Sequence, residues 1–182
     1  MLKLLISLIL LVSTPAFGSG IVIDVRGEAN GTLTIDLFED IAPNHTNRIL
    51  KLAEEGFYDG VVFHRVIEGF MAQTGDGQFG KVSGDLRRAG MGGSNYPDLK
   101  AEFSNISYER GVVGMARSQN PDSGNSQFFI MFAEGSFLNG QYTVIGKVTN
   151  GLDVLDKIKK GLGQNGLVLG EPDFMNTVSE FY

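Results

Sequence analysis

The part of the sequence that most restricts the fold is Phe63-His64-Arg65-Val66-Ile67-Glu68-Gly69-Phe70-Met71-Ala72-Gln73-Thr74-Gly75-Asp76. Residues 61–67 and 70–74 are rich in β-branched and aromatic residues, which predicts two strands. Strand alternation places Arg65 on the same face as Phe63 and Ile67, with His64 on the other face. An arginine on an apolar face either reaches solvent along its stem or meets a partner. The segment alone favours an ordinary surface arginine.

A second informative stretch is Ser126-Gln127-Phe128-Phe129-Ile130. As a strand it places Gln127 and Phe129 on one face, while Phe128 and Ile130 point into a core. An amide beside an aromatic ring suits a peptide-binding surface, because the amide can hold backbone and the ring can take an apolar side chain. Alone, however, the stretch is more often a sheet with one polar residue.

Working outward, short alternating or β-branched runs recur between glycine-rich turns. They predict strands at residues 21–25, 32–37, 61–67, 70–74, 111–116, 127–132, 142–148 and 175–181. Asn30-Gly31 is a hairpin signal between the first two strands. Helices are predicted from Pro43 to a cap at Gly56, and over residues 152–159. The pattern indicates a mainly β protein, a closed or nearly closed barrel with helical caps.

Residues 75–100 form a long irregular loop, and long loops in compact domains are usually functional. Gly75-Asp76-Gly77-Gln78-Phe79-Gly80 matches G-x-G-x-x-G by spacing alone. A dinucleotide site needs a helix directly after the glycines, and none is predicted there. We therefore interpret this segment as a turn.

Composition excludes several classes of function. The 182 residues suit one domain, and the net charge of −6 makes nucleic acid an unfavourable partner. The chain has no cysteine, which rules out thiol catalysis and thiolate metal sites. Its two histidines, His45 and His64, are isolated and do not form a metal-binding pattern. We expect no metal and no cofactor.

The N-terminus has the pattern of a secretory signal. Lys3 precedes an apolar run from Leu4 to Val12, and Ala16-Phe17-Gly18 resembles a cleavage site. The run is shorter than the roughly 20 residues that span a bilayer. We predict a signal peptide at residues 1–18, a mature domain at 19–182, no membrane association after cleavage, and export. Export would be to the periplasm if the source is a Gram-negative bacterium.

Together, these segments resemble the cyclophilin family of peptidyl-prolyl cis-trans isomerases. The resemblance is carried by residues 63–76, by Gly114-Met115-Ala116-Arg117, by residues 125–130 and by residues 137–146, in that order. It covers nearly the whole mature chain. It implies a closed eight-stranded antiparallel β-barrel capped by two α-helices, with the active site on the outer face, and a monomer.

Carried over by position, the resemblance makes Arg65 the catalytic residue. It assigns the proline ring to a pocket of Phe70, Met71, Phe129 and Leu138. It assigns the substrate backbone to Gln73, Ala116, Arg117 and Gln127, with Phe137 and Tyr142 at the rim and His64 adjoining the site.

The sequence departs from the better-known eukaryotic form at three site positions. Phe137 and Tyr142 stand where that form has tryptophan and histidine, and Arg117 stands where it has asparagine. Since the tryptophan contributes to cyclosporin binding, we expect weak cyclosporin binding. Glu68 replaces a common proline, and the sequence offers no account of its effect.

The expected partners are proline-containing peptides and unfolded exported proteins. A different class of function stays open at this point, namely a non-catalytic proline-peptide-binding module or holdase chaperone on the same fold. Such a protein would not need Arg65. A hydrolase using His64 is a third and weaker alternative, because no serine or acidic residue stands at an informative offset.

Overall fold

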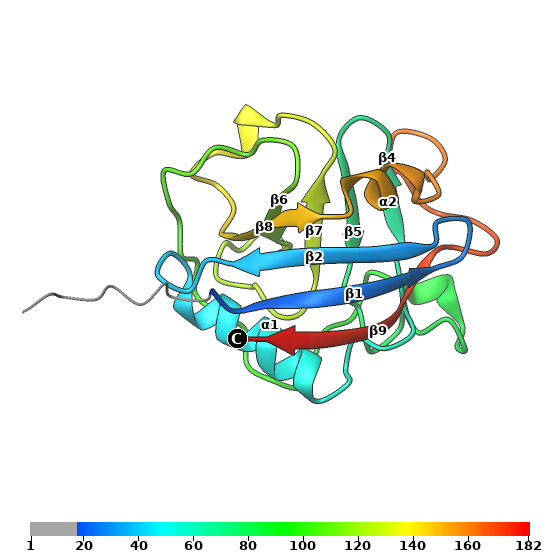
Figure 1. The fold of residues 1–182 in the computed structure, drawn as a ribbon, viewed down its shortest axis with the longest axis horizontal. Helices are drawn as coiled ribbons and strands as arrows, with labels where there is room; N and C mark the ends of the chain where they lie inside the picture. The colour runs from blue at the N-terminus through cyan, green and yellow to red at the C-terminus, as the bar shows by residue number, and fades with distance from the viewer. Residues whose placement is uncertain (1–17) are drawn as a thin grey trace, which may run out of the picture.

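The computed structural model describes residues 18–182 (Figure 1). Its strands are β1 Gly20–Arg26, β2 Gly31–Leu37, β3 Val61–Val62, β4 Arg65–Ile67, β5 Met71–Thr74, β6 Val112–Met115, β7 Phe128–Met131, β8 Val144–Asn150 and β9 Phe174–Phe181. Its helices are α1 Pro43–Glu54 and α2 Leu152–Lys157, with short 3-10 turns η1 Leu86–Arg88 and η2 Ser136–Leu138. The mainly β prediction with two helices is confirmed.

The closed eight-stranded barrel is wrong in detail. The described strands form one antiparallel sheet of nine strands in the order β3-β9-β1-β2-β8-β6-β7-β5-β4, which curls into an open half-barrel. The ninth strand arises because the strand expected at 61–67 breaks at Phe63-His64. Its two halves, β3 and β4, become the opposite edges of the sheet. The intervening backbone bonds to the C-terminal loop, from Phe63 N to Asp173 O (2.8 Å) and from Val168 N to His64 O (3.1 Å).

The break also changes the side-chain alternation. Phe63 and Val66 both enter the main core, whereas Arg65 and Ile67 face outward and are only partly buried. Phe63 therefore does not share a face with Arg65 as the simple two-residue period requires. Arg65 and the buried Val66 are consecutive residues that point to different faces of the sheet, so Arg65 places a cation on the outer face.

The first hairpin forms as expected, but its turn lies earlier. β1 pairs with β2 from Gly20↔Asp36 to Val25↔Gly31, so Gly31 is already the first residue of β2. The connection is residues 27–30, closed by a bond from the Asn30 side chain to Gly27 O (2.8 Å). Gly27 has a φ of +135°, a conformation that L side chains rarely adopt.

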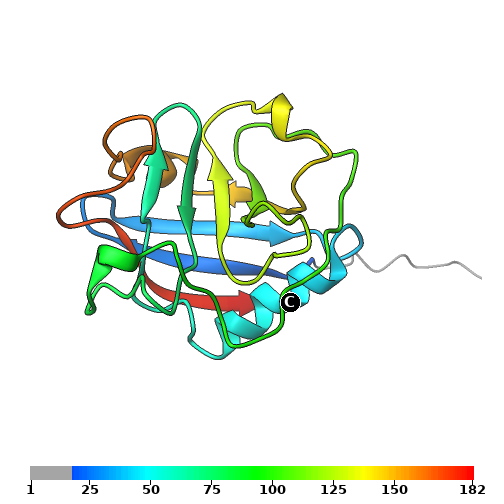
Figure 2. The same cartoon turned by 180° about the vertical axis from the view of Figure 1, so that it is seen from behind.

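The two helices lie at opposite ends of the sheet (Figures 1 and 2). Pro43 opens α1, where its missing N–H costs no helical bond. Ile49, Leu52 and Ala53 are buried along one face of α1. Gly56 follows the helix with a φ of +65° and donates to Ala53 O, which confirms the predicted cap.

Two apolar clusters lie on the two faces of the sheet. Phe128 and Ile130 of β7 enter the main core with α1, while Phe129 and Met131 enter a second cluster with Tyr108. Alternation along one strand therefore supplies both clusters, as predicted for Phe128, Phe129 and Ile130. The second cluster supports the outer face on which Arg65 lies.

Residues 18–182 contain no helix long and apolar enough to cross a bilayer. The predicted signal peptide falls almost entirely on residues 1–17, outside the described part of the chain, and stays a prediction. The sheet begins at Gly20, two residues after the predicted cleavage point, and Ser19 O accepts a bond from Leu37 N (2.9 Å).

Candidate active site

Three polar and aromatic side chains form a row across neighbouring strands. Arg65 lies directly opposite Gln73, and Gln73 directly opposite Phe129. Directly opposed residues in antiparallel strands carry their side chains on the same face. The row therefore follows from backbone pairing, and it brings together residues that are 64 positions apart in the sequence.

Arg65 is half-buried beside apolar groups. Its Nη1 donates to Gln73 Oε1 (3.2 Å) and contacts Met71 Sδ (3.8 Å), and its Nε donates to Asn165 O (3.0 Å). Burial lowers the pKa of Arg65, but a guanidinium stays protonated in proteins. Within residues 18–182 it forms no salt bridge, and its Nη2 makes no hydrogen bond. The positive charge and the Nη2 donors of Arg65 are therefore available to another molecule.

A pocket of about 310 Å³, lined mainly by apolar and aromatic side chains, opens beside this guanidinium. We call it the proline pocket, after the ring that the family resemblance predicts it to hold, and its lining residues are Arg65, Phe70, Met71, Gln73, Ala116, Arg117, Phe129, Phe137, Leu138 and Tyr142. Phe129 and Tyr142 meet edge to face, with ring centroids 5.7 Å apart. Phe137, on η2, stays 64% exposed at the rim against Phe70. Rings on several sides make a slot for a small apolar ring.

Gly114 of β6 makes room for the wall of this pocket. A Cβ at this position would lie 2.4 Å from both the ring tip of Phe129 and the hydroxyl of Tyr108. Those two rings stack with centroids 5.7 Å apart. The glycine in the Gly114-Met115-Ala116-Arg117 motif is therefore required by close packing.

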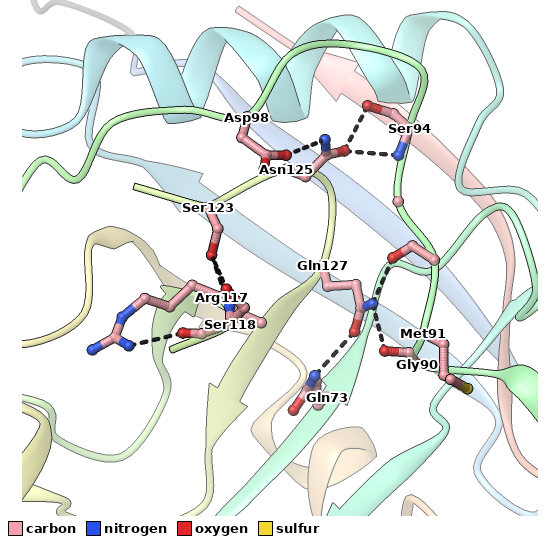
Figure 3. Close-up of a pocket in the computed structure, with 13 residues that line it drawn as sticks. Gln73, Gly90, Met91, Ser94, Asp98, Arg117, Ser118, Ser123, Asn125 and Gln127 are labelled. Carbon is pink, nitrogen blue, oxygen red and sulfur yellow. Dashed lines mark hydrogen bonds between the residues drawn. The ribbon is translucent and has the colours of Figure 1, made fainter. Parts of the chain in front are cut away.

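A second pocket of about 420 Å³ adjoins the first and is built largely by loops (Figure 3). We call it the loop pocket, and its lining residues are Gln73, Gly90, Met91, Gly92, Gly93, Ser94, Asp98, Ala116, Arg117, Ser118, Ser123, Asn125 and Gln127. Arg117 lies between the two pockets, with its guanidinium 4.3 Å from the Tyr142 ring centroid and Nη2 bonded to Gln141 O (2.9 Å). Three residues, Gln73, Ala116 and Arg117, line both pockets.

The loop wall is fastened from two sides. The fully buried Asp76 carboxylate accepts from the backbone N–H groups of Gly90 (2.8 Å) and Gly92 (2.9 Å). Gln127 Nε2 donates to the carbonyl groups of the same two glycines (3.0 and 2.8 Å; Figure 3). Gln127 Oε1 then accepts from Gln73 Nε2 (3.0 Å), and Gln73 in turn holds Arg65. A chain of hydrogen bonds thus connects the loop to the guanidinium.

His64 lies behind this wall and lines neither pocket. It is 5% exposed, and both ring nitrogens are without a hydrogen bond within the described residues. A Cβ on Gly90 would come within 2.7 Å of its ring. Burial lowers the pKa of His64 to about 4, although Asp76 opposes the shift. At neutral pH the imidazole is uncharged and has no route to a substrate.

The structure therefore gathers ten of the twelve site residues proposed from sequence in the proline pocket, and Gln127 lines the loop pocket. Sequence analysis missed Asp76, as well as the loop residues near Gly90 and Asn125. It expected residues 75–100 to be functional but could not say which of them face the site. The sequence signal for Asp76 was an acidic residue with a glycine on each side, Gly75 and Gly77. Residues 18–182 hold no group of three or more His, Cys, Asp or Glu that could bind a metal.

The fold and site define a class of protein in which a half-buried cation borders a pocket, lined mainly by apolar and aromatic side chains, on the outer face of a curled antiparallel sheet. Residues 22–177 match the family model described as cyclophilin type peptidyl-prolyl cis-trans isomerase/CLD. A probable peptidyl-prolyl cis-trans isomerase of Brucella suis is 61% identical over 142 residues, covering 76% of this chain and 72% of the relative. A peptidyl-prolyl cis-trans isomerase of Helicobacter pylori is 41% identical over 135 residues, covering 72% of this chain and 76% of that relative.

Solved structures agree. A cyclophilin-type isomerase of Cryptosporidium parvum, determined in the presence of the dipeptide Ala-Pro, matches with a TM-score of 0.73 and 25% identity over 90% of this chain and 99% of its own. A cyclophilin of Hirschia baltica matches with a TM-score of 0.70 and 25% identity, covering 87% of this chain and 72% of its own. The chain belongs to the cyclophilin-type peptidyl-prolyl cis-trans isomerase family. It is an isomerase of the peptide bond that precedes proline.

Proposed function

We propose that Arg65 is the catalytic residue of this isomerase and that the proline pocket holds the substrate ring. One observation carries the proposal. The half-buried guanidinium has no carboxylate partner within residues 18–182, keeps an uncommitted Nη2, and borders an apolar slot. A cation in such a place has donors to offer to a molecule bound in the slot.

The chemistry follows from the amide bond. Its partial double-bond character gives a rotation barrier of about 20 kcal/mol. Twisting the bond localises a lone pair on the prolyl nitrogen, and Arg65 donates a hydrogen bond to that lone pair. The planar ground state lacks this interaction, so it stabilises the transition state selectively. A rate increase of about 10³–10⁴ requires only about 4–5.5 kcal/mol.

The surrounding residues restrict which part of the substrate moves. Phe70, Met71, Phe129 and Leu138 clamp the proline ring, with Phe137 and Tyr142 at the rim. Gln73, Ala116, Arg117 and Gln127 bond or contact the peptide backbone. With the ring held, the preceding carbonyl swings. The Cryptosporidium relative solved in the presence of Ala-Pro supports a proline-peptide ligand.

The test is NMR exchange on a short Xaa-Pro peptide with wild type, Arg65→Ala and Arg87→Ala. Arg87 is a matched control, because its side chain is 88% exposed and paired with Asp85. We expect Arg65→Ala to lose about 100-fold to 1,000-fold in kcat/KM, the range for loss of one transition-state donor. Arg87→Ala should keep full activity. Full activity of folded Arg65→Ala would refute the role of Arg65.

The proposal extends to cellular role. The isomerase is exported, and it accelerates proline-limited folding of unfolded exported proteins as a monomer. Support comes from the predicted signal at residues 1–18 and from prolines being accessible in unfolded chains, where their slow exchange limits folding. Cell fractionation with N-terminal mass analysis checks this, and sedimentation checks the monomer. Cytosolic protein that retains residues 1–18 would overturn export.

A further inference from the structure

The row of residues that carries the active site extends beyond Arg65. On one side of β4, Arg65 faces Gln73, then Phe129, then Gly114 across β5, β7 and β6. On the other side, Arg65 also pairs with Leu167, and Leu167 pairs with Leu162. These two leucines therefore lie on the same face of the sheet as the proposed catalytic residue.

Regular hydrogen bonds hold this extension against β4. Val66 N donates to Gly166 O (2.7 Å) and Val168 N donates to His64 O (3.1 Å), one on each side of the Arg65–Leu167 pair. This is the arrangement of a non-hydrogen-bonded antiparallel pair, in which opposed Cα atoms lie about 4.5 Å apart. Arg65 Nε bonds to Asn165 O at the turn. The segment after α2 runs beside β4 (Figure 2).

Three leucines of this segment face solvent. Leu162 is 67% exposed, Leu167 51% and Leu169 55%, while Val168 between the last two packs against the main core. The alternation puts Leu167 and Leu169 outward together. Single exposed leucines are common, but a group of them beside a binding site indicates an interaction surface. We call Leu162, Leu167 and Leu169 the leucine patch.

We propose that the leucine patch is an accessory subsite for an apolar side chain of the same polypeptide whose proline is bound in the proline pocket. The inference rests on the proposed function above. Continuity identifies the occupant, because the backbone pairing connects the patch to Arg65 without an intervening element. Apolar side chains close to an exposed proline are a property of unfolded chains, which are the substrates proposed here.

The spacing of the sheet sets the reach. Neighbouring strands lie about 4.8 Å apart, so Leu162 is about 10 Å from Arg65 across two ladders, and Phe129 is about 14 Å from Leu167 across three. An extended chain advances about 3.3 Å per residue. The contacting side chain therefore stands about three or four residues from the proline.

The experiment is a peptide series in which one leucine or one serine stands two, three or four residues from the proline, on either side. Isomerisation is followed by NMR exchange with the mature protein, with Leu162→Ser/Leu167→Ser, and with Val82→Ser. Val82 is 43% exposed and belongs to neither the proline pocket nor the leucine patch, so it is a matched control. Comparing leucine and serine peptides on the wild type needs no variant at all.

We expect at least one leucine position to have a KM about five- to tenfold lower than its serine counterpart. Because the contact is made equally in ground and transition states, kcat should stay the same. The double variant should lose the difference and Val82→Ser should keep it. Equal KM values at every position, with serine peptides isomerised normally, would overturn the leucine patch alone.

Two other results would also overturn the subsite. If the wild type accelerates no peptide, the proposed function fails and takes this inference with it. If sedimentation shows a wild-type dimer that the double variant dissociates, the patch is an interface between two copies of the chain.

Discussion

The two neighbouring pockets are built in different ways. The proline pocket is based on side chains of β4, β5 and β7, whose positions follow from ladder pairing. The loop pocket depends on residues 90–98 and 118–125, which Asp76, Gln127 and Asn125 hold by hydrogen bonds. Replacing a side chain of the proline pocket should therefore change the activity of the site but leave the shape of the pocket intact. Replacing one of the residues that hold the loop pocket should change the shape of that pocket.

The strongest test of this contrast is Asp76→Ala. Its carboxylate is buried and accepts four backbone N–H bonds, from Gln78, Phe79, Gly90 and Gly92. Hydrogen bonds to a charged group contribute more than neutral ones, and unpaired buried donors add a desolvation cost. We expect a loss of about 4 kcal/mol in the free energy of unfolding, measured by urea denaturation.

The control is Asp85→Asn on the same loop, where the carboxylate is 57% exposed. Its urea midpoint should not move. If Asp76→Ala fails to fold, Asp76→Asn keeps one acceptor oxygen and should lose about half as much. A fully stable Asp76→Ala would show that the loop pocket is held by something other than this carboxylate.

The second test uses pH. Burial is the main reason that the pKa of His64 is lowered to about 4, with Arg65 adding to the shift and Asp76 opposing it. Between pH 6.5 and 4 the unfolded chain binds a proton that the folded chain refuses, so stability present above pH 6.5 is lost as pH falls. The full loss is about 3 kcal/mol. It should appear as a lower urea midpoint at pH 4 than at pH 7.

Carboxylates also titrate in this pH range, so a His64 variant is needed to isolate the contribution of His64 to the pH dependence of stability. His64→Leu should reduce the pH 7 to pH 4 difference by about 3 kcal/mol. His45→Gln should not remove that component, since His45 lies elsewhere, against Glu102 (2.6 Å). An unchanged slope in His64→Leu would mean that His64 is hydrated in the folded protein.

Side-chain alternation predicted from the sequence was correct in one strand of the site and wrong in another. Alternation placed Phe129 correctly on the outer face and Phe128 inside, because β7 is a regular strand. Alternation failed at Phe63-His64, where the chain leaves one sheet edge for the other. No local propensity marks that break, since it depends on bonds to residues over 100 positions away, such as Asp173.

Asp76 was hidden for the same reason. Its identity suggests a turn, which is how we interpreted it from sequence. Its function as an anchor depends on Gly90 and Gly92 folding back over it. The twelve proposed site residues came from a family resemblance, whereas composition and periodicity alone left Arg65 as a surface arginine.

The third test asks whether the two pockets communicate. Gln127→Ala removes both bonds to the loop carbonyls and the acceptor for Gln73, which orients Arg65. We expect kcat to fall about tenfold, the equivalent of about 1.4 kcal/mol, with a smaller change in KM. The NMR signals of the Arg65 guanidinium should broaden or shift, which a purely structural loss elsewhere would not cause.

Gln78→Ala is its control, because Gln78 makes a single long bond to the loop, from Gly93 N (3.4 Å). Its kcat should stay within about twofold of wild type. If Gln127→Ala keeps full kcat with sharp, unshifted Arg65 signals, the two pockets are independent and Gln127 serves the loop pocket alone.

The smallest effect is expected at the rim, with cyclosporin as the probe. Phe137 is 64% exposed, so an indole at this position would extend the rim without disturbing the second apolar cluster. Tryptophan offers more apolar area and an N–H donor, neither of which phenylalanine can match. We expect wild type to bind cyclosporin weakly and Phe137→Trp to bind it about fivefold more tightly by calorimetric titration, about 1 kcal/mol. Tight binding by the wild type would show that the other walls of the proline pocket suffice for this ligand.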